Sequence, residues 1–161
     1  MEIRKATKHD LDRIMKIFED AKTFMRRSGN LTQWGGGYPQ RRLMEEETEH
    51  GHCYVCCDGN GTVAATFCLL PGPDPTYAHI YDGQWIDNRT YHVLHRLASD
   101  GSIKGAGRFC LEWCIERCPN LRVDTHADNL PMQKLLASHS FVRCGKIRVE
   151  DGSWRIAYQH Q

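Results

Sequence analysis

The sequence has almost no net charge and no long apolar run. Its 161 residues include 21 Lys and Arg against 20 Asp and Glu, which gives a net charge of +1. This balance lacks the basic surface that is typical of nucleic-acid binding or of attraction to an anionic membrane. No apolar stretch reaches the ~18–20 residues that cross a bilayer. We therefore expect a single domain over residues 1–161, with neither nucleic acid nor membrane as a partner.

The first residues also lack the apolar core of an export signal. We therefore expect a cytoplasmic protein. Because disulfides are rare in the cytoplasm, its eight cysteines should be free thiols. Three cysteines recur every four residues and predict a buried stripe on one helix face: Cys110, Cys114 and Cys118. The sequence favours free thiols that pack as small apolar side chains.

A complete set of metal ligands is not evident in the sequence. Cys53, Cys56 and Cys57 have a metal-like spacing, but a zinc site needs about four convergent ligands. On a strand, Cys53 and Cys57 would point to one face and Cys56 to the other. The nine histidines form no H-x3-H or HExxH pair. We expect no metal, and a metal-binding redox protein stays as a minor alternative that rests on the cysteine count.

Two common phosphate-binding motifs are also absent from the glycine-rich turn at residues 102–108. The turn reads Ser-Ile-Lys-Gly-Ala-Gly-Arg, without the Gly-Lys-Ser/Thr ending of a P-loop or the third glycine of a dinucleotide fingerprint. It follows an apolar run and precedes an amphipathic helix. That layout predicts free N–H groups and a helix dipole that attract an anion, with Lys104 and Arg108 adding positive charge. A tight strand-to-helix connection without a ligand is the alternative.

Hydrophobic periodicity predicts strands and helices that partly alternate along the chain. A Thr7-x-x-Asp10 pattern resembles a capping box at the start of the first helix, which ends near Gly29. Residues 58–61 form a hairpin turn, and residues 76–90 are expected to be irregular. The order predicts a mixed α/β sheet with helices on both faces. We expect strands at 2–6, 53–57, 62–70, 91–98, 121–126, 141–149 and 153–159, and later helices at 40–50, 108–118 and 130–139.

These features resemble those of the GNAT superfamily of acyl-CoA-dependent N-acetyltransferases. The family's pyrophosphate loop reads R/Q-x-x-G-x-G/A, and here Ser102 departs at the first position while both glycines match. Downstream, Asn129 opens a helix that ends near Phe141, as in the family. The resemblance implies a mixed, mostly antiparallel central sheet. It also implies direct transfer of an acetyl group from acetyl-CoA to a primary amine of a small molecule or peptide, in a ternary complex.

The resemblance places acetyl-CoA along the strand before the glycine-rich turn and on the turn itself. Backbone groups at the end of that strand would pair with the pantetheine arm, and the N–H groups of the turn would bind the pyrophosphate. Asn129 would contact the pantetheine, cap the following helix, or do both. The implied cofactor-binding residues are Leu97, Ala98, Ser99, Lys104, Gly105, Ala106, Gly107, Arg108 and Asn129.

The general acid and base are less evident. Many family members carry a tyrosine acid seven residues after the asparagine, and here that position is Leu136. His126 or Ser138 could replace it, with Asp124 tuning the pKa of His126. His95 is the candidate base, because imidazole accepts protons near neutral pH, although a histidine on an apolar face can also be a core residue. Alternation along the strand would place His95 on one face with Val93 and Leu97.

The loop between the first two helices is rich in glycine and aromatic residues. In the family this segment lines the acceptor site, which implies that Gln33, Trp34 and Tyr38 bind substrate. The alternative is a loop folded onto the core with Trp34 as its plug. Terminal strand pairs often support dimers in this fold, so a homodimer is a further expectation. The alternative function is a non-catalytic module that binds acyl-CoA or another protein.

Overall fold

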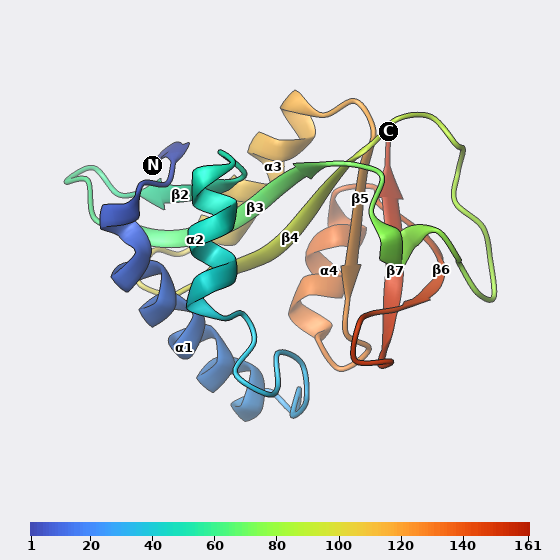
Figure 1. Cartoon of the computed structure of the whole chain (residues 1–161), viewed down its shortest axis with the longest axis horizontal. Helices are drawn as coiled ribbons and strands as arrows, with labels where there is room; N and C mark the ends of the chain where they lie inside the picture. The colour runs from blue at the N-terminus through green and yellow to red at the C-terminus, as the bar shows by residue number, and fades with distance from the viewer.

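The computed structural model describes residues 1–161, which form one seven-stranded sheet in the order β1-β2-β3-β4-β5-β7-β6 (Figure 1). Only β4 and β5 pair in parallel, and every other pair is antiparallel. The predicted mixed, mostly antiparallel sheet is therefore confirmed. The strands are β1 Glu2–Lys5, β2 Cys53–Cys57, β3 Val63–Pro71, β4 His92–Ser99, β5 Leu121–Thr125, β6 Val142–Arg148 and β7 Trp154–His160.

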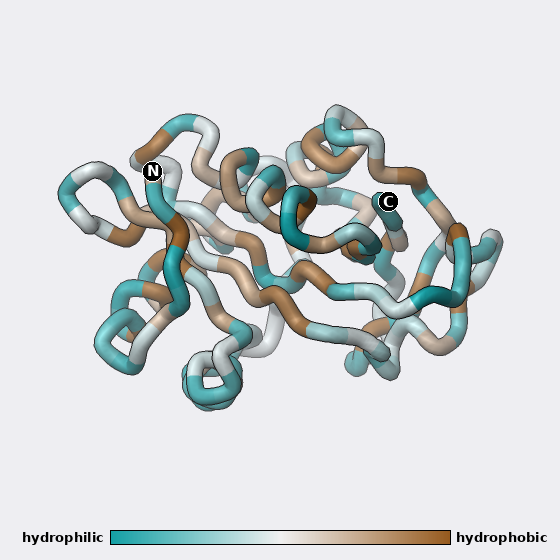
Figure 2. The backbone as a smooth tube through the Cα atoms, turned by 90° about the horizontal axis from the view of Figure 1, so that it is seen from above, coloured by the Kyte–Doolittle hydropathy of each residue, from teal (hydrophilic) through white to brown (hydrophobic).

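Two helices cover each face of the sheet, as expected. The helices α1 (Leu11–Arg27) and α2 (Arg41–Glu49) lie on one face, while α3 (Ala106–Arg117) and α4 (Leu130–Ser138) lie on the other (Figure 1). Viewed from above, the strands run between the helical layers and carry many of the apolar, brown segments (Figure 2). No helix of the structure has both the length and the apolar character needed to cross a membrane.

The cysteines divide between the two cores as the alternation predicts. Cys53 and Cys57 pack in the core beneath α1, whereas Cys56 packs in the core beneath α3. The stripe on α3 is buried in that second core, and it includes Cys110 and Cys114. All eight cysteines are buried and free. Their periodicity therefore reflects packing of small apolar side chains.

Strand β4 is paired on both edges only along its first half. It pairs with β5 only through His92, Val93 and Leu94, whereas on the opposite edge its pairing with β3 continues to Ser99. A bulge interrupts that second ladder at Arg96, whose φ is 56°. The two strands therefore separate at the end of β4, and no strand pairs with its last residues on the β5 side.

The bulge also corrects one expectation about side-chain directions. Val93 and Leu97 were expected to share a face, but Val93 packs in a small core beside Tyr77, and Leu97 packs against the core beneath α3. An extra residue in one strand reverses the alternation beyond it. His95 therefore lies before the reversal and Leu97 after it.

Helix starts follow the predicted caps with small shifts. The Thr7 N–H donates to the Asp10 carboxylate at 2.8 Å, and a short 3₁₀ turn, Lys8–Asp10, precedes α1. Helix α3 begins two residues earlier than expected, because Gly105 adopts a φ of 82° and serves as its N-cap. Glycine reaches this left-handed conformation without steric cost.

Candidate functional site

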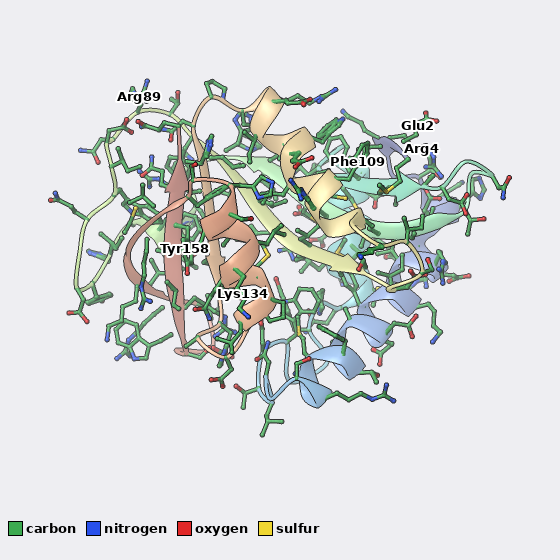
Figure 3. All side chains as sticks on the ribbon, turned by 180° about the vertical axis from the view of Figure 1, so that it is seen from behind. Glu2, Arg4, Arg89, Phe109, Lys134 and Tyr158 are labelled. Atoms are coloured by element: carbon green, nitrogen blue, oxygen red, sulfur yellow. The ribbon has the colours of Figure 1, made fainter.

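A cleft of about 350 Å³ lies where β4 and β5 separate. Its walls include the end of β4 (Leu97, Ala98 and Ser99), Gly107 of α3 and Asn129 before α4, and α1 closes the remaining side. Figure 3 shows this side of the molecule, with α3 and α4 in front of the sheet. Five of the nine predicted cofactor-binding residues thus line one cavity. The other four, Lys104, Gly105, Ala106 and Arg108, belong to the adjoining turn.

The start of α3 presents unpaired N–H groups beside this cleft. The N–H groups of Gly105, Gly107 and Arg108 donate no hydrogen bond to the backbone, whereas that of Ala106 donates to the Ile103 carbonyl at 3.3 Å. Ala106 is therefore not the free donor that the sequence predicted. A Cβ atom built on Gly107 would meet nothing within 4 Å. The remaining donors and the space in front of them fit an anionic group.

Asn129 joins the cleft to the loop between α1 and α2. Its Oδ1 accepts from the Met132 N–H at 3.2 Å, which makes it the N-cap of α4. Its Nδ2 donates to Gln33 Oε1 at 3.1 Å, and Gln33 also accepts from Asn30 at 2.6 Å. Gln33 is buried and is not among the residues that line the cleft. The sequence identified the cap but missed this contact with the loop.

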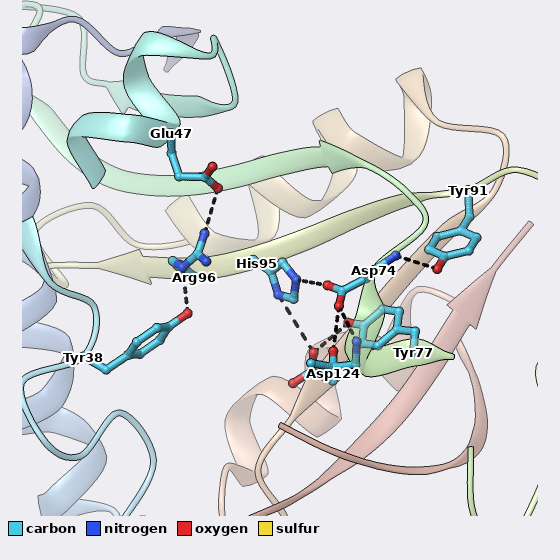
Figure 4. A network of polar contacts seen from close by, with 9 residues as sticks. Tyr38, Glu47, Asp74, Tyr77, Tyr91, His95, Arg96 and Asp124 are labelled. Atoms are coloured by element: carbon cyan, nitrogen blue, oxygen red, sulfur yellow. Dashed lines mark hydrogen bonds and ion pairs between the residues drawn. The ribbon is translucent and has the colours of Figure 1, made fainter. Parts of the chain in front are cut away.

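The two predicted aromatic residues of that loop lie in different surroundings. Trp34 packs edge-on against Phe18, with ring centroids 5.5 Å apart, which matches the alternative of a plug on the core. The Tyr38 hydroxyl accepts a hydrogen bond from Arg96 Nε at 2.8 Å. Burial raises the pKa of Tyr38, so its hydroxyl stays protonated. Arg96 also donates to Glu47 Oε2 at 3.0 Å (Figure 4).

His95 lies at the centre of a second polar cluster. Its Nε2 is 2.8 Å from Asp74 Oδ2, and its Nδ1 is 3.9 Å from Asp124 Oδ2 (Figure 4). The Tyr77 hydroxyl donates to the same Asp124 oxygen at 2.6 Å. Although burial alone would raise the pKa of Asp74, hydrogen bonds from His95 and Thr76 lower it to about 2. Asp74 therefore stays ionised beside the imidazole at neutral pH.

His126 has a separate set of partners. Its Nδ1 accepts from the Asp128 N–H at 3.0 Å, so its proton belongs on Nε2, which lies 3.0 Å from Thr32 Oγ1. Burial, and then the charge of Arg155, lower the pKa of His126. The nearby carboxylate is Asp128, at 3.7 Å, whereas Asp124 contacts His95 and Tyr77 instead. The neutral imidazole is therefore the favoured form.

The other acid candidate, Ser138, and the family's tyrosine position, Leu136, have different surroundings from His126. Leu136, at the position of the family's tyrosine, is completely buried in the core beneath α3. The Ser138 hydroxyl donates to the Leu135 carbonyl at 2.8 Å, and Ser138 does not line the cleft. Neither side chain presents a proton donor to the cavity, and His126 is not among the residues that line it.

Solved structures of similar shape identify the fold. No protein-family model matches the chain, and no curated protein matches it. A GNAT-family acetyltransferase from Streptococcus agalactiae is 32% identical, with a TM-score of 0.88, over 98% of this chain and 93% of the other.

Two more distant structures share the fold at 20% identity. A GNAT-family acetyltransferase from Listeria monocytogenes has a TM-score of 0.69, over 99% of this chain and 93% of the other. A ribosomal-protein-alanine N-acetyltransferase from Brucella melitensis has a TM-score of 0.66, over 99% of both chains. Since the Streptococcus agalactiae protein is similar in sequence over almost the whole chain, this protein belongs to the GNAT family of acetyltransferases.

Proposed function

We propose that this protein is an N-acetyltransferase that takes the acetyl group from acetyl-CoA and transfers it directly to a primary amine. The acceptor would be a small molecule or a peptide. One observation carries the proposal: the open end of β4 lies beside the unpaired N–H groups of α3, at one cleft. An extended chain with a phosphorylated end fits that combination, because one part needs strand-like partners and the other needs anion-binding donors.

The open edge of β4 would hold the pantetheine arm. The Asp100 N–H donates to Ala64 of the β3 side at 3.1 Å, so alternation turns the N–H of Ser99 toward the open side. The pyrophosphate would then lie on the N–H groups of Gly105, Gly107 and Arg108. Backbone donors near residues 97–99 would also polarise the thioester carbonyl. All these contacts come from the backbone, which explains how Ser102 can depart from the family's pattern.

Acid and base roles would fall to the two histidines. His95, held by Asp74, would take a proton from the acceptor ammonium as the general base. His126 would act as the acid in its imidazolium form, donating the Nε2 proton to the departing thiolate and leaving the neutral imidazole. Holding acetyl-CoA and amine together supplies much of the rate in such a reaction. A ping-pong route through an acetyl-cysteine is disfavoured by the burial of all eight thiols.

Calorimetric titration with acetyl-CoA tests the first half of this proposal. Free CoA and ATP are the controls, because ATP shares the adenine and phosphate groups but not the pantetheine arm. We expect selective micromolar binding of both CoA compounds. Absence of binding, or equal binding of ATP, would overturn the assignment of the cleft.

The second half needs a turnover assay. Release of free CoA thiol would be followed with a panel of primary amines that includes amino acids, polyamines and peptides. The burial of Leu136, where many relatives carry the acid, favours the alternative of a non-catalytic acyl-CoA-binding or protein-interaction module. Turnover with any amine excludes that alternative, whereas binding without turnover across the panel supports it.

A further inference from the structure

We propose that the C-terminal end of α2 carries a binding site for a divalent transition-metal ion such as Zn²⁺, formed by Glu47, His50 and His52. Each residue offers one ligand atom, and these three atoms lie within 4.8 Å of one another. None of the three lines the proposed acetyl-CoA cleft. The site therefore lies outside that cleft, although Glu47 is linked through Arg96 to Tyr38.

Local structure brings the three side chains together. Glu47 and His50 are three residues apart at the end of a helix, which places them on one face. Gly51, with a φ of 73°, then reverses the chain, and the His52 N–H donates to the Glu47 carbonyl at 2.9 Å. This turn places the His52 side chain beside that of Glu47. The sequence search for H-x3-H or HExxH pairs missed the arrangement because it spans a helix end.

The polar atoms of the cluster are not satisfied by the protein alone. Glu47 is buried, and its Oε2 accepts from Arg96 at 3.0 Å. Its other oxygen, Oε1, lies 3.7 Å from His52 Nδ1, too far for a hydrogen bond. His52 Nδ1 is buried without any hydrogen-bond partner. A buried unpaired polar atom is costly, and a bound cation would satisfy both atoms.

The spacing of these atoms suits one shared ion. Two ligand atoms at ~2.0–2.1 Å from a tetrahedral Zn²⁺ stand about 3.3–3.4 Å apart, which is a few tenths of an ångström less than the observed 3.7 Å. Small side-chain rotations close that difference. The third ligand, His50, is exposed, so it can swing onto the ion from the solvent side.

The ligand set indicates which metals the site would take. Two imidazoles and one carboxylate suit Zn²⁺, Cu²⁺ or Ni²⁺, whereas Mg²⁺ and Ca²⁺ prefer oxygen ligands alone. Three protein ligands leave a further coordination position for water. Arg96 holds the far oxygen of Glu47, so the carboxylate would bridge the ion and the guanidinium.

Zinc titration of tag-free, reduced protein tests the proposal. We expect calorimetry to show one Zn²⁺ per chain, with affinity at least tenfold weaker in His50→Ala. That substitution is conservative for folding because the His50 side chain is exposed and makes no hydrogen bond. His79→Ala is the matched control, since His79 is also exposed, and it should bind as the unaltered protein does. Equal affinity in His50→Ala, or no binding to the unaltered protein, would overturn the site.

A second measurement separates this site from the cysteines. Glu47→Gln keeps an oxygen for Arg96 but removes the anionic ligand, so we expect weaker Zn²⁺ binding. We also expect a lower melting temperature, because the largely buried Arg96 guanidinium loses its charged partner. Co²⁺ would replace Zn²⁺ as a spectroscopic probe. Visible d–d bands without a thiolate charge-transfer band support histidine and carboxylate ligands. A thiolate band in the near ultraviolet would assign the metal to a cysteine and overturn the proposal.

Discussion

Two regions along β4 differ in the chemical groups that they offer to a ligand. The cleft at the end of β4, between α1, α3 and α4, offers backbone groups and apolar side chains, and its walls also include Asp20, Asp100 and Asp128. On the side of the loop between α1 and α2, charged and hydroxyl side chains gather around His95 and Arg96 (Figure 4). The contacts proposed for acetyl-CoA therefore come from the main chain, whereas the cluster around His95 and Arg96 consists of side chains.

The two kinds of surface respond differently to substitutions. Backbone donors are present whatever the side chains are, so a site built from them tolerates substitutions such as Ser102 for the family's Arg or Gln. A site built from side chains changes with each substitution. We therefore expect acetyl-CoA binding to depend on the path of the chain, and acceptor choice and proton transfer to depend on particular residues of the His95 cluster.

The largest effect on acetyl-CoA binding should come from a bulky side chain in front of the α3 donors. Gly107→Leu would place a side chain in the open space beside the α3 donors, and we expect calorimetry to show acetyl-CoA affinity at least ~100-fold weaker. The melting temperature should not fall, because glycine inside a helix costs about 1 kcal/mol relative to good helix formers. Gly59→Leu, also with open space around it, is the control. Unchanged binding by Gly107→Leu would contradict the placement of acetyl-CoA.

In the cluster around His95, the substitution His95→Gln should slow the reaction without changing acetyl-CoA affinity. Loss of a general base lowers kcat/KM by roughly 10²–10⁴-fold, measured with whichever amine the panel identifies. Acetyl-CoA affinity should not change, because His95 does not line the cleft. His92→Gln, three residues earlier and exposed, is the matched control. Full activity in His95→Gln would remove His95 as the base.

Asp74→Asn should produce a smaller loss through His95. A hydrogen bond to a charged group contributes about 1.5–3 kcal/mol, so we expect kcat to fall about 10- to 100-fold while the KM for acetyl-CoA stays constant. Asp82→Asn serves as the control, since Asp82 is exposed and its carboxylate pairs with Lys146. If kcat were equal in both variants, Asp74 would have no role in positioning the imidazole.

Asn129→Ala tests the link between the cleft and the loop. Loss of an N-cap costs about 1 kcal/mol, and we expect the free energy of unfolding in urea to fall by that amount. Gln33 would also lose one of its two donors. Asn129→Ser, which restores a capping oxygen, should recover most of the difference. Equal stability of the alanine and native proteins would argue against the cap.

The smallest effect should appear in the pH dependence of stability. Burial lowers the pKa of His126 below its ordinary value of 6.5, so the unfolded chain binds more protons than the folded one as the pH falls through that value. Stability therefore decreases between about pH 7.5 and 5.5. In His126→Gln, the melting temperature should change less across this range. A steeper pH dependence in the variant would contradict the sign.

Local patterns predicted most of the fold, and they failed where distant segments meet. The strand order along the chain, the cysteine stripe of α3 and the caps at Thr7 and Asn129 depend on neighbours within a few residues. The bulge at Arg96 does not, because it arises where β4 meets β3. It moved Leu97 to the opposite face, which an uninterrupted alternation could not predict.

The candidate site divides in the same way. The sequence analysis singled out the glycine-rich turn and His95 as candidates, but it did not identify the residues that contact them. Asp74 lies 21 residues from His95, and Tyr38 lies 58 residues from Arg96. Contacts between residues so far apart along the chain produce no periodic pattern in the sequence. Arg96, Glu47 and Tyr77 were missed for this reason, since nothing local distinguishes them from other polar residues.

The sequence by itself determined the order of strands and helices, the buried faces and the position of the glycine-rich turn. These depend on periodicity and on the conformations that glycine and capping residues permit near each position. Only the tertiary structure decided that β4 and β5 separate after Leu94, that Asp74 and Asp124 meet at His95, and that His52 returns to Glu47. Such contacts form when packing of the two cores brings separate segments together, and spacing along the chain does not encode them.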